Sequence, residues 1–286
     1  MNAMSVTAIT EARAALDAAG QLPEDEIDLG AVALQLARVD QPHLDLSAAQ
    51  SLLSDVARRA VALAAANPAA DAGDAELRRD VLARLLHEEF GFAGDAETYD
   101  DMANANLAAV LARRRGLPVA LGILWLHAAE AAGWEAHGID FPGHFLLALP
   151  GREGPALVDV FHGGRRLQAP DLRALLKRME GPKAELRPGM MMAMGKRAVL
   201  LRLQNNIKLR RLRGQDLEGA LACVEDMLRL APMNPLLWRE AGLMQHRLER
   251  IGAALAALEK SVVLAPQAEG TERIRNLIEE LRHRLN

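Results

Sequence analysis

The chain has 286 residues, half of them hydrophobic and a quarter charged, which is enough for about two soluble globular domains. Its formal net charge of −4 conceals an asymmetry: residues 1–110 carry 19 Asp and Glu against 7 Lys and Arg, whereas residues 165–213 carry 14 Lys and Arg against 3 Asp and Glu. The single cysteine, Cys223, excludes an internal disulfide and a multi-cysteine metal cluster, and it favours a reducing compartment.

The N-terminal third of the chain has the pattern of a helical subdomain. Its first twenty residues lack the basic-then-apolar layout of a signal peptide, and the most apolar stretch, residues 118–132, is too short to span a bilayer. We therefore expect a cytoplasmic protein with no membrane segment. Apolar residues at helical spacing predict three helices, over residues 29–39, 47–65 and 74–90. We assign residues 1–95 to this subdomain.

The middle of the chain reads as an α+β core. Residues 119–132 are apolar nearly all round, which indicates a helix buried inside the domain. Strand-like runs follow, separated by Gly and Pro turns, and they cover residues 135–140, 145–149 and 156–161. One buried helix followed by strands at hairpin spacing is typical of an α+β fold. We assign residues 96–180 to this core and residues 181–200 to a linker.

The last third is helical and has an internal period of 34 residues. Ala220-Leu221-Ala222 recurs as Ala254-Leu255-Ala256, and Leu230-Ala231-Pro232 recurs as Leu264-Ala265-Pro266. The second copy carries Trp238, Gly242, Ala254 and Pro266 at the spacing of a tetratricopeptide unit, whereas the first has Gln204 and Lys208 in place of Trp and Gly. Residues 201–286 are therefore predicted to form tetratricopeptide-like repeats with a closing helix. Such hairpins stack into a concave surface that binds protein, so we expect a protein or peptide partner.

A histidine and an aspartate in the core region suggest a chemical site. His144 opens one predicted strand, and Asp159, 15 residues later, falls in its expected hairpin partner. Adjacent antiparallel strands could bring the two side chains together. A carboxylate that holds one imidazole nitrogen fixes the tautomer and leaves the other nitrogen as a base. The alternative is that His144 only begins a strand and that Asp159 only caps a turn.

Neither a metal site, a cofactor nor a nucleic-acid partner is predicted. His137, His144 and His162 could converge with Asp140 or Asp159, but their spacing matches no compact zinc motif. The basic stretch 165–213 has no interleaved aromatic residues on which bases would stack.

Short blocks along the chain carry a family resemblance. They are 90–94 (FGFAG), Tyr99, Asn104 with Leu107, Val110 and Leu111, 114–118 (RRGLP), 141–146 (FPGHFL), 159–164 (DVFHGG), 201–203 (LRL) and 205–206 (NN). In this order they resemble the SirB-type transglutaminase-like/tetratricopeptide proteins of bacteria, over roughly residues 30–270. The resemblance implies a papain-like transglutaminase core joined to a repeat module, and some members are labelled regulators.

The resemblance also implies a triad that this chain does not complete. Enzymes of the transglutaminase fold use Cys, His and Asp, with the cysteine at the N-terminus of the buried helix, where the helix dipole and the imidazolium stabilise a thiolate. His144 and Asp159 match the second and third positions. Residues 117–120 (Leu-Pro-Val-Ala), where the helix begins, contain no nucleophile, and residues 62–260 contain no serine.

We therefore expect an α+β, predominantly helical pseudoenzyme that binds a protein or peptide through its repeat surface and degenerate cleft, in a regulatory role. The remnant dyad is His144 and Asp159, and the candidate binding residues are Asn104, Arg115, Phe141, His162 and Trp238. The alternative is an atypical hydrolase or amidase in which the His144–Asp159 pair activates water without a cysteine. A third hypothesis is that the repeats brace a homodimer.

Overall fold

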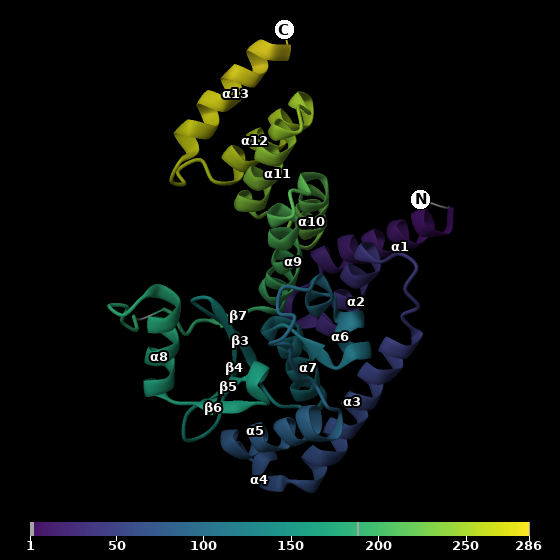
Figure 1. Cartoon of the computed structure of the whole chain (residues 1–286), viewed down its shortest axis with the longest axis vertical. Helices are drawn as coiled ribbons and strands as arrows, with labels where there is room; N and C mark the ends of the chain where they lie inside the picture. Colours follow the sequence, from purple (N-terminus) through teal and green to yellow (C-terminus); the bar gives the residue numbers. More distant parts are fainter. Residues whose placement is uncertain (1–2, 188, 286) are drawn as a thin grey trace. The chain divides into compact units, whose positions relative to one another are not determined.

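The computed structural model describes residues 3–187 and 189–285, which form two compact units (Figure 1). Unit 1 comprises Met1–Ala12 and Pro23–Leu203, and unit 2 comprises Arg13–Leu22 and Gln204–Asn286. Helices α1 (Ala3–Gln21) and α9 (Lys196–Arg213) contribute residues to both units, and α9 begins within the stretch predicted as a linker. In the described part of the chain, every helix is too short or too polar to cross a lipid bilayer.

The N-terminal part of unit 1 is helical, as predicted. Its helices are α2 (Leu29–Asp40), α3 (Ser47–Ala66), α4 (Pro68–Asp71), α5 (Ala75–Ala83) and α6 (Leu107–Arg113), with short turns η1 (Glu24–Glu26), η2 (Arg84–Glu89) and η3 (Met102–Ala105). The predicted helices at 29–39 and 47–65 are confirmed. The helix predicted at 74–90 is divided into α5 and the π-helical η2, in which Phe90 N donates to Leu85 O. The short α4 was not predicted, and it starts with Pro68, a residue favoured in a first helical turn.

The buried helix of the core is α7 (Pro118–Ala131), which is enclosed along nearly its whole length. Leu117, at its N-cap position, and Ala120 are almost completely inaccessible. One side of α7 meets strand β4 at Gly122, where an added Cβ would lie only 2.2 Å from Phe145 Cε1. The glycine therefore lets the helix lie directly on the ring of Phe145.

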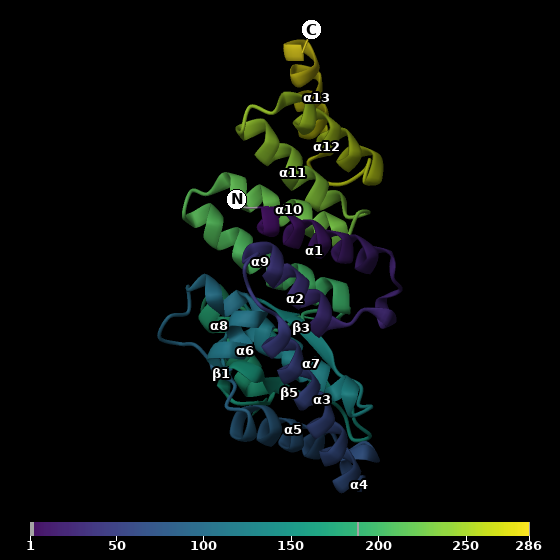
Figure 2. The same ribbon diagram turned by 90° about the vertical axis from the view of Figure 1, so that its right-hand side faces the viewer.

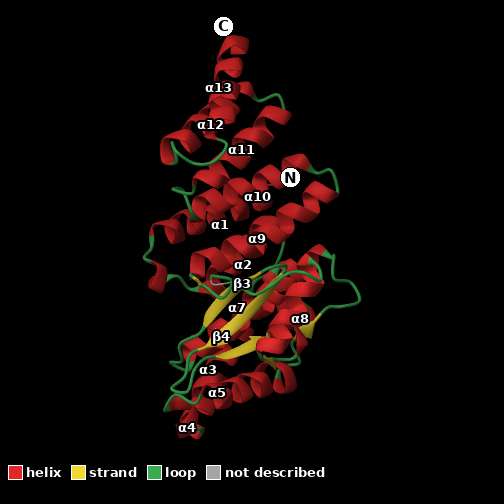
Figure 3. Cartoon of the chain, turned by 90° about the vertical axis from the view of Figure 1, so that its left-hand side faces the viewer, coloured by secondary structure: helices red, strands yellow, loops and turns green. Residues whose placement is uncertain are grey.

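A five-stranded antiparallel sheet covers α7. Its strands are β3 (His137–Phe141), β4 (His144–Leu149), β5 (Ala156–Asp159), β6 (Arg165–Leu167) and β7 (Ala193–Met194), in the order β6-β5-β4-β3-β7 (Figure 1). Figure 3 shows the strands in yellow among the red helices. The three predicted strands are confirmed, although β5 ends at Asp159 and continues as the turn η4 (Val160–His162). The strands β6 and β7 were missed because runs of three and two residues carry no alternation pattern. A separate parallel pair joins β1 (Ala93–Gly94) to β2 (Arg115–Gly116).

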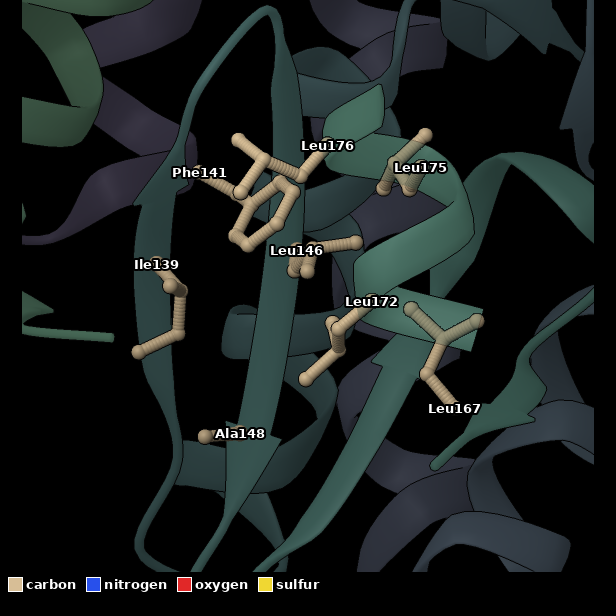
Figure 4. Close-up of a cluster of buried hydrophobic side chains, with 8 residues drawn as sticks. All are labelled: Ile139, Phe141, Leu146, Ala148, Leu167, Leu172, Leu175 and Leu176. Atoms are coloured by element: carbon tan, nitrogen blue, oxygen red, sulfur yellow. The ribbon is translucent and has the colours of Figure 1, made fainter. Parts of the chain in front are cut away.

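Helix α8 (Ala169–Glu180) lies on the side of the sheet opposite to α7 (Figure 1). Between α8 and the strands is a hydrophobic cluster (Figure 4), formed by Ile139, Phe141, Leu146, Ala148, Leu167, Leu172, Leu175 and Leu176. The sheet is therefore packed on both faces, and its position relative to α7 is tightly constrained.

Unit 2 has the predicted repeat. Its helices are α10 (Leu217–Leu230), α11 (Pro235–Arg247), α12 (Ile251–Leu264) and α13 (Thr271–Leu285), which follow one another in Figure 2. Gly242 lies where α11 crosses α12, since an added Cβ would be 2.6 Å from Leu258 Cγ. The α11–α12 hairpin and the closing helix at residue 271 confirm the repeat assignment.

Candidate functional site

The structure places His144 beside Asp159. His144 is the first residue of β4 and Asp159 is the last residue of β5, and His144 Nε2 lies 3.3 Å from Asp159 Oδ1. Both side chains are largely buried, with 12 % and 9 % of their surface exposed. The β-hairpin register, in which Leu147 faces Val158, brings these two strand ends together.

Asp159 has two further partners. His162 Nδ1 lies 2.7 Å from Asp159 Oδ2, and the backbone N–H of Phe161 donates to Asp159 Oδ1 at 3.2 Å, which caps the turn η4. The two readings of the sequence therefore coexist, because the same carboxylate holds an imidazole and caps a turn. The shared use of Asp159 by two histidines was not anticipated.

The ionisation of Asp159 determines the tautomer of His144. Burial alone would raise the pKa of the Asp159 carboxyl, but the hydrogen bonds and charges of His144 and His162 outweigh burial and lower this pKa from 3.8 to about 2. An ionised carboxylate only accepts hydrogen bonds, so Nε2 of His144 carries a proton and donates it to Asp159. In the neutral ring, Nδ1 is then the unprotonated nitrogen.

This arrangement predicts acid-sensitive stability. A carboxyl whose pKa is lower in the folded state stabilises the protein above its unfolded pKa, and that contribution is lost as the pH falls toward about 2. A pKa lowered from 3.8 in the unfolded chain to about 2 in the folded protein adds about 2 kcal/mol to the free energy of unfolding above pH 4 or so. In urea unfolding, Asp159→Asn should be less stable than wild type at about pH 5, and the gap should narrow toward about pH 2.5.

Asp95 serves as an internal control for this comparison. The pKa of Asp95 is also lowered to about 2, chiefly by hydrogen bonds from Thr98. Because Asp95 is present in wild type and in Asp159→Asn alike, its contribution cancels in the difference between their free energies of unfolding. A stability gap that stays constant with pH would show that Asp159 is not held ionised by its histidines.

The N-terminus of α7 has no attacking atom. Leu117, Pro118, Val119 and Ala120 form its N-cap and first turn, all four are buried, and none has a nucleophilic side chain. Cys223 is buried in α10 of unit 2. Unit 1 thus brings the imidazole of His144 and the carboxylate of Asp159 together, whereas the single cysteine of the sequence belongs to unit 2.

A hydrogen-bonded loop adjoins the start of α7. Asp95 accepts hydrogen bonds from Thr98 N at 2.8 Å and Thr98 Oγ1 at 2.6 Å, and from Arg113 Nη2 at 3.0 Å. Asn104 is completely buried, and its side-chain Nδ2 donates to the backbone carbonyl of Thr98. The backbone carbonyl of Asn104 accepts a hydrogen bond from the backbone N–H of Leu117. Asn104 therefore fixes the loop against the helix. The roles of Asp95 and Arg113 were missed, although Asp95-x-x-Thr98 has the spacing of a side-chain-capped turn.

Aromatic rings connect this loop to the histidines. The ring of Phe161 packs on Gly94, where an added Cβ would be 2.5 Å from Phe161 Cδ2. Tyr99 and His162 both contact Phe161 edge-to-face, with ring centroids at 5.8 and 5.2 Å. His162, with 59 % of its side chain exposed, and Tyr99, which is 43 % exposed, are the accessible members of this group.

The other predicted binding residues each have contacts of their own within their unit. Arg115 is exposed, and its Nη1 donates to Gly91 O at 3.0 Å. Phe141 has no exposed surface and belongs to the cluster under α8 (Figure 4). Trp238, in unit 2, donates its indole N–H to Pro232 O at 2.7 Å and so fastens the turn before α11.

Of the residues considered for a metal, His144 and His162 both contact Asp159, whereas His137 and Asp140 have other partners. His137 Nε2 lies 3.2 Å from Glu135 Oε1, and Asp140 pairs with Arg202. Within residues 3–187 and 189–285, no three His, Cys, Asp or Glu side chains are arranged to hold a metal ion.

Unit 2 has a hollow on its repeat helices, which we call the repeat hollow. It has a volume of about 270 Å³ and is lined by Lys208, Leu209, Leu212, Glu240, Leu243, Met244 and Arg247, from α9 and α11. Leu209 and Leu243 are 42 % and 38 % exposed. Lys208 is nearly buried and forms an ion pair of 2.5 Å with Glu240.

Two family models match the chain: the transglutaminase-like superfamily over residues 47–205 and the tetratricopeptide repeat over residues 207–279. A UPF0162 protein of Vibrio cholerae is 30 % identical over 211 residues, which are 73 % of this chain and 78 % of that protein. A UPF0162 protein of Xylella fastidiosa is 27 % identical and covers 90 % of this chain and 91 % of its own length. Protein SirB1 of Salmonella typhimurium is 28 % identical over 71 % of this chain and 76 % of its own.

Proposed function

The chain belongs to the transglutaminase-like superfamily, in its SirB-type branch with a tetratricopeptide repeat, and from this premise we propose that it is a non-catalytic, regulatory protein of the cytoplasm that binds a protein partner. In this proposal the subdomain 1–95 and the core 96–180 form the scaffold, residues 181–200 link it to the repeat, and residues 201–286 supply the recognition surface. Loss of the cysteine position supports the non-catalytic part, because covalent acyl transfer requires a nucleophile.

The repeat hollow is the observation that carries the binding role. Leucine side chains that are more than a third exposed, such as Leu209 and Leu243, are costly in water, and an apolar partner side chain would cover them. The Lys208–Glu240 pair neutralises itself, and the described residues set no carboxylate against Arg247. The surface therefore favours a partner segment that combines apolar residues with at least one Asp or Glu.

The proposal is tested by a peptide selected against the full-length protein and then measured calorimetrically with purified variants. Leu243→Asp should weaken binding at least about tenfold, because a charge replaces the apolar wall of the hollow. Met233→Asp is the matched control: Met233 is 69 % exposed and does not line the hollow, so affinity should stay unchanged. Equal affinity of both variants would reject the repeat hollow as the binding surface.

A second function is favoured by the His144–Asp159 geometry. The unprotonated Nδ1 of His144 is suited to activate water for hydrolysis or deamidation, without a covalent intermediate. His144→Ala distinguishes the two proposals. It should leave peptide affinity unchanged if the protein is a binding module, whereas any amidase turnover of wild type should disappear in this variant if the dyad is catalytic.

A further inference from the structure

Helix α8 presents a row of cations to solvent. Its three leucines point into the hydrophobic cluster against the sheet (Figure 4), and this contact fixes the rotation of the helix about its axis. Arg173, Lys177 and Arg178 therefore fall on the opposite side, and all three are exposed. In Figure 1, α8 lies at the periphery of unit 1, with its outer side turned away from the sheet.

Two further cations follow α8 along the chain and lie beside it. Ala184 and Leu186 pack against the same hydrophobic cluster as α8, while Lys183 and Arg187, which alternate with them, are exposed. We give the name α8 cationic surface to this set of five side chains: Arg173, Lys177, Arg178, Lys183 and Arg187. No role described above uses this surface.

The fold leaves these five cations without partners. Among the described residues, none of the five side chains contacts a carboxylate, a backbone carbonyl or an aromatic ring. The two arginines just before α8 are paired, Arg165 with Asp171 at 2.7 Å and Arg166 with Glu76 at 2.8 Å. Every other Lys or Arg that the structure describes in unit 1 has such a contact, except Arg152. An external carboxylate would therefore meet the α8 cationic surface without displacing an internal one.

The same surface offers apolar contact points. Met179, in the last turn of α8, is 46 % exposed. It is held in place by the turn that precedes His144, since an added Cβ at Gly143 would lie 3.0 Å from Met179 Cε. Ala174, on the outer side between the cations, is exposed and small, so it leaves room for a partner's backbone. Cations interspersed with an exposed methionine are a combination that protein partners use.

The charge pattern distinguishes between kinds of partner. Residues 172–187 hold five cations against two glutamates, Glu180 and Glu185, which gives this stretch a net charge of +3. A nucleic-acid backbone or an anionic membrane presents negative charge continuously and would be repelled by these glutamates. A protein segment can place neutral or basic residues opposite them.

We propose that the α8 cationic surface binds an acidic protein segment. Carboxylates of the segment pair with Arg173, Lys177 and Arg178, and the guanidinium groups can receive them in bidentate fashion. An aliphatic side chain of the segment lies on Met179. This surface lies within unit 1, so the proposal goes beyond the repeat hollow and does not depend on it.

The test is a fluorescence-anisotropy titration of a labelled acidic peptide with the full-length protein. The probe consists of three repeats of Glu-Leu-Ala-Glu-Ala, which combine spaced carboxylates with aliphatic side chains. The triple variant Arg173→Gln, Lys177→Gln, Arg178→Gln should bind this probe at least about tenfold more weakly, because the charge-assisted contacts are lost. Leu243→Asp should retain probe binding. Loss of binding in Leu243→Asp but not in the triple variant would place the probe in the repeat hollow and overturn the proposal.

A matched variant controls for net charge. Arg58→Gln, Arg84→Gln, Arg152→Gln removes the same number of positive charges from exposed positions of unit 1 and should change affinity by less than about twofold. Equal losses in the two triple variants would show that the probe senses net charge alone, and would overturn the proposal.

Two other probes check the class of partner. A labelled DNA duplex and phosphatidylserine vesicles should each bind more weakly than the peptide in about 150 mM salt, where long-range attraction is screened. Tighter binding of either one, lost in the Arg173, Lys177, Arg178 triple variant, would assign the surface to that partner and reject an acidic protein segment.

Discussion

Replacing Gly122 with alanine should destabilise unit 1 by about 3 kcal/mol, because a methyl group at this position overpacks a filled core. The added Cβ would lie 2.2 Å from Cε1 and 2.8 Å from Cζ of Phe145. The ring has no room to retreat, since an added Cβ at Gly138, on strand β3, would also lie 2.8 Å from Phe145 Cε2. The variant should show a lower urea midpoint than wild type when unfolding is followed by near-ultraviolet circular dichroism.

Two further variants make the Gly122 prediction specific. Phe145→Leu in the Gly122→Ala background should recover part of the lost stability, because a smaller side chain relieves the overlap. Gly252→Ala is the matched control, since Gly252 lies in α12 with no atom within 4 Å of an added Cβ. It should be neutral or stabilise by up to about 1 kcal/mol, as alanine favours a helix. Wild-type stability in Gly122→Ala would mean that α7 does not lie directly on β4.

The second large effect is expected in unit 2, where Arg13→Ala should lower the free energy of unfolding by about 3 kcal/mol. Arg13 Nε lies 2.9 Å from Asp226 Oδ1, and the Asp226 side chain is only 2 % exposed. Without Arg13, the carboxylate keeps one partner, Arg229, whose Nε is 3.5 Å away. Removing one member of a buried pair leaves a charge that water cannot solvate. Chemical unfolding of the full-length protein measures the loss.

The pH dependence of this loss has a defined sign. Burial raises the pKa of the Asp226 carboxyl, and Arg13 and Arg229 oppose that rise. A carboxyl whose pKa is raised by folding destabilises the protein above that pKa, and the cost disappears as the pH falls through it. Removing Arg13 makes it more unfavourable to bury the ionised Asp226 carboxylate. The difference in free energy of unfolding between Arg13→Ala and wild type should therefore shrink as the pH is lowered.

Two variants complete the Arg13 test. Asp226→Asn in the Arg13→Ala background should restore stability, because it removes the unpaired charge. Arg250→Ala breaks an exposed pair with Glu218 in the same unit and should change stability by less than about 1 kcal/mol. If Arg13→Ala behaved like Arg250→Ala, the Asp226 carboxylate would have to be solvated.

Much of the architecture follows from local sequence. Helical periodicity and turn residues predict α2, α3 and α7 and the strands β3 to β5, because each of these elements has its own amphipathic or apolar pattern. The 34-residue period likewise predicts the repeat, and the absence of a nucleophile at residues 117–120 is a matter of chemical identity that no packing can change.

Other features depend on contacts between distant residues. Asp159 pairs with His162 as well as with His144, and Phe141, which stands inside a motif typical of the family, is a core residue under α8. Residues 13–22 of the first helix belong with the repeat, through a contact between Arg13 and Asp226, 213 positions away in sequence.

By itself, then, the sequence determined which elements form, that the C-terminal helices repeat, and that no cysteine stands at residues 117–120, where the buried helix begins. The tertiary structure alone decided which side chains are buried, which carboxylate contacts two imidazoles, and where the repeat hollow lies. The physical reason is that local propensity acts over a few residues. Burial, charge pairing and cavities arise only when separate segments pack against one another.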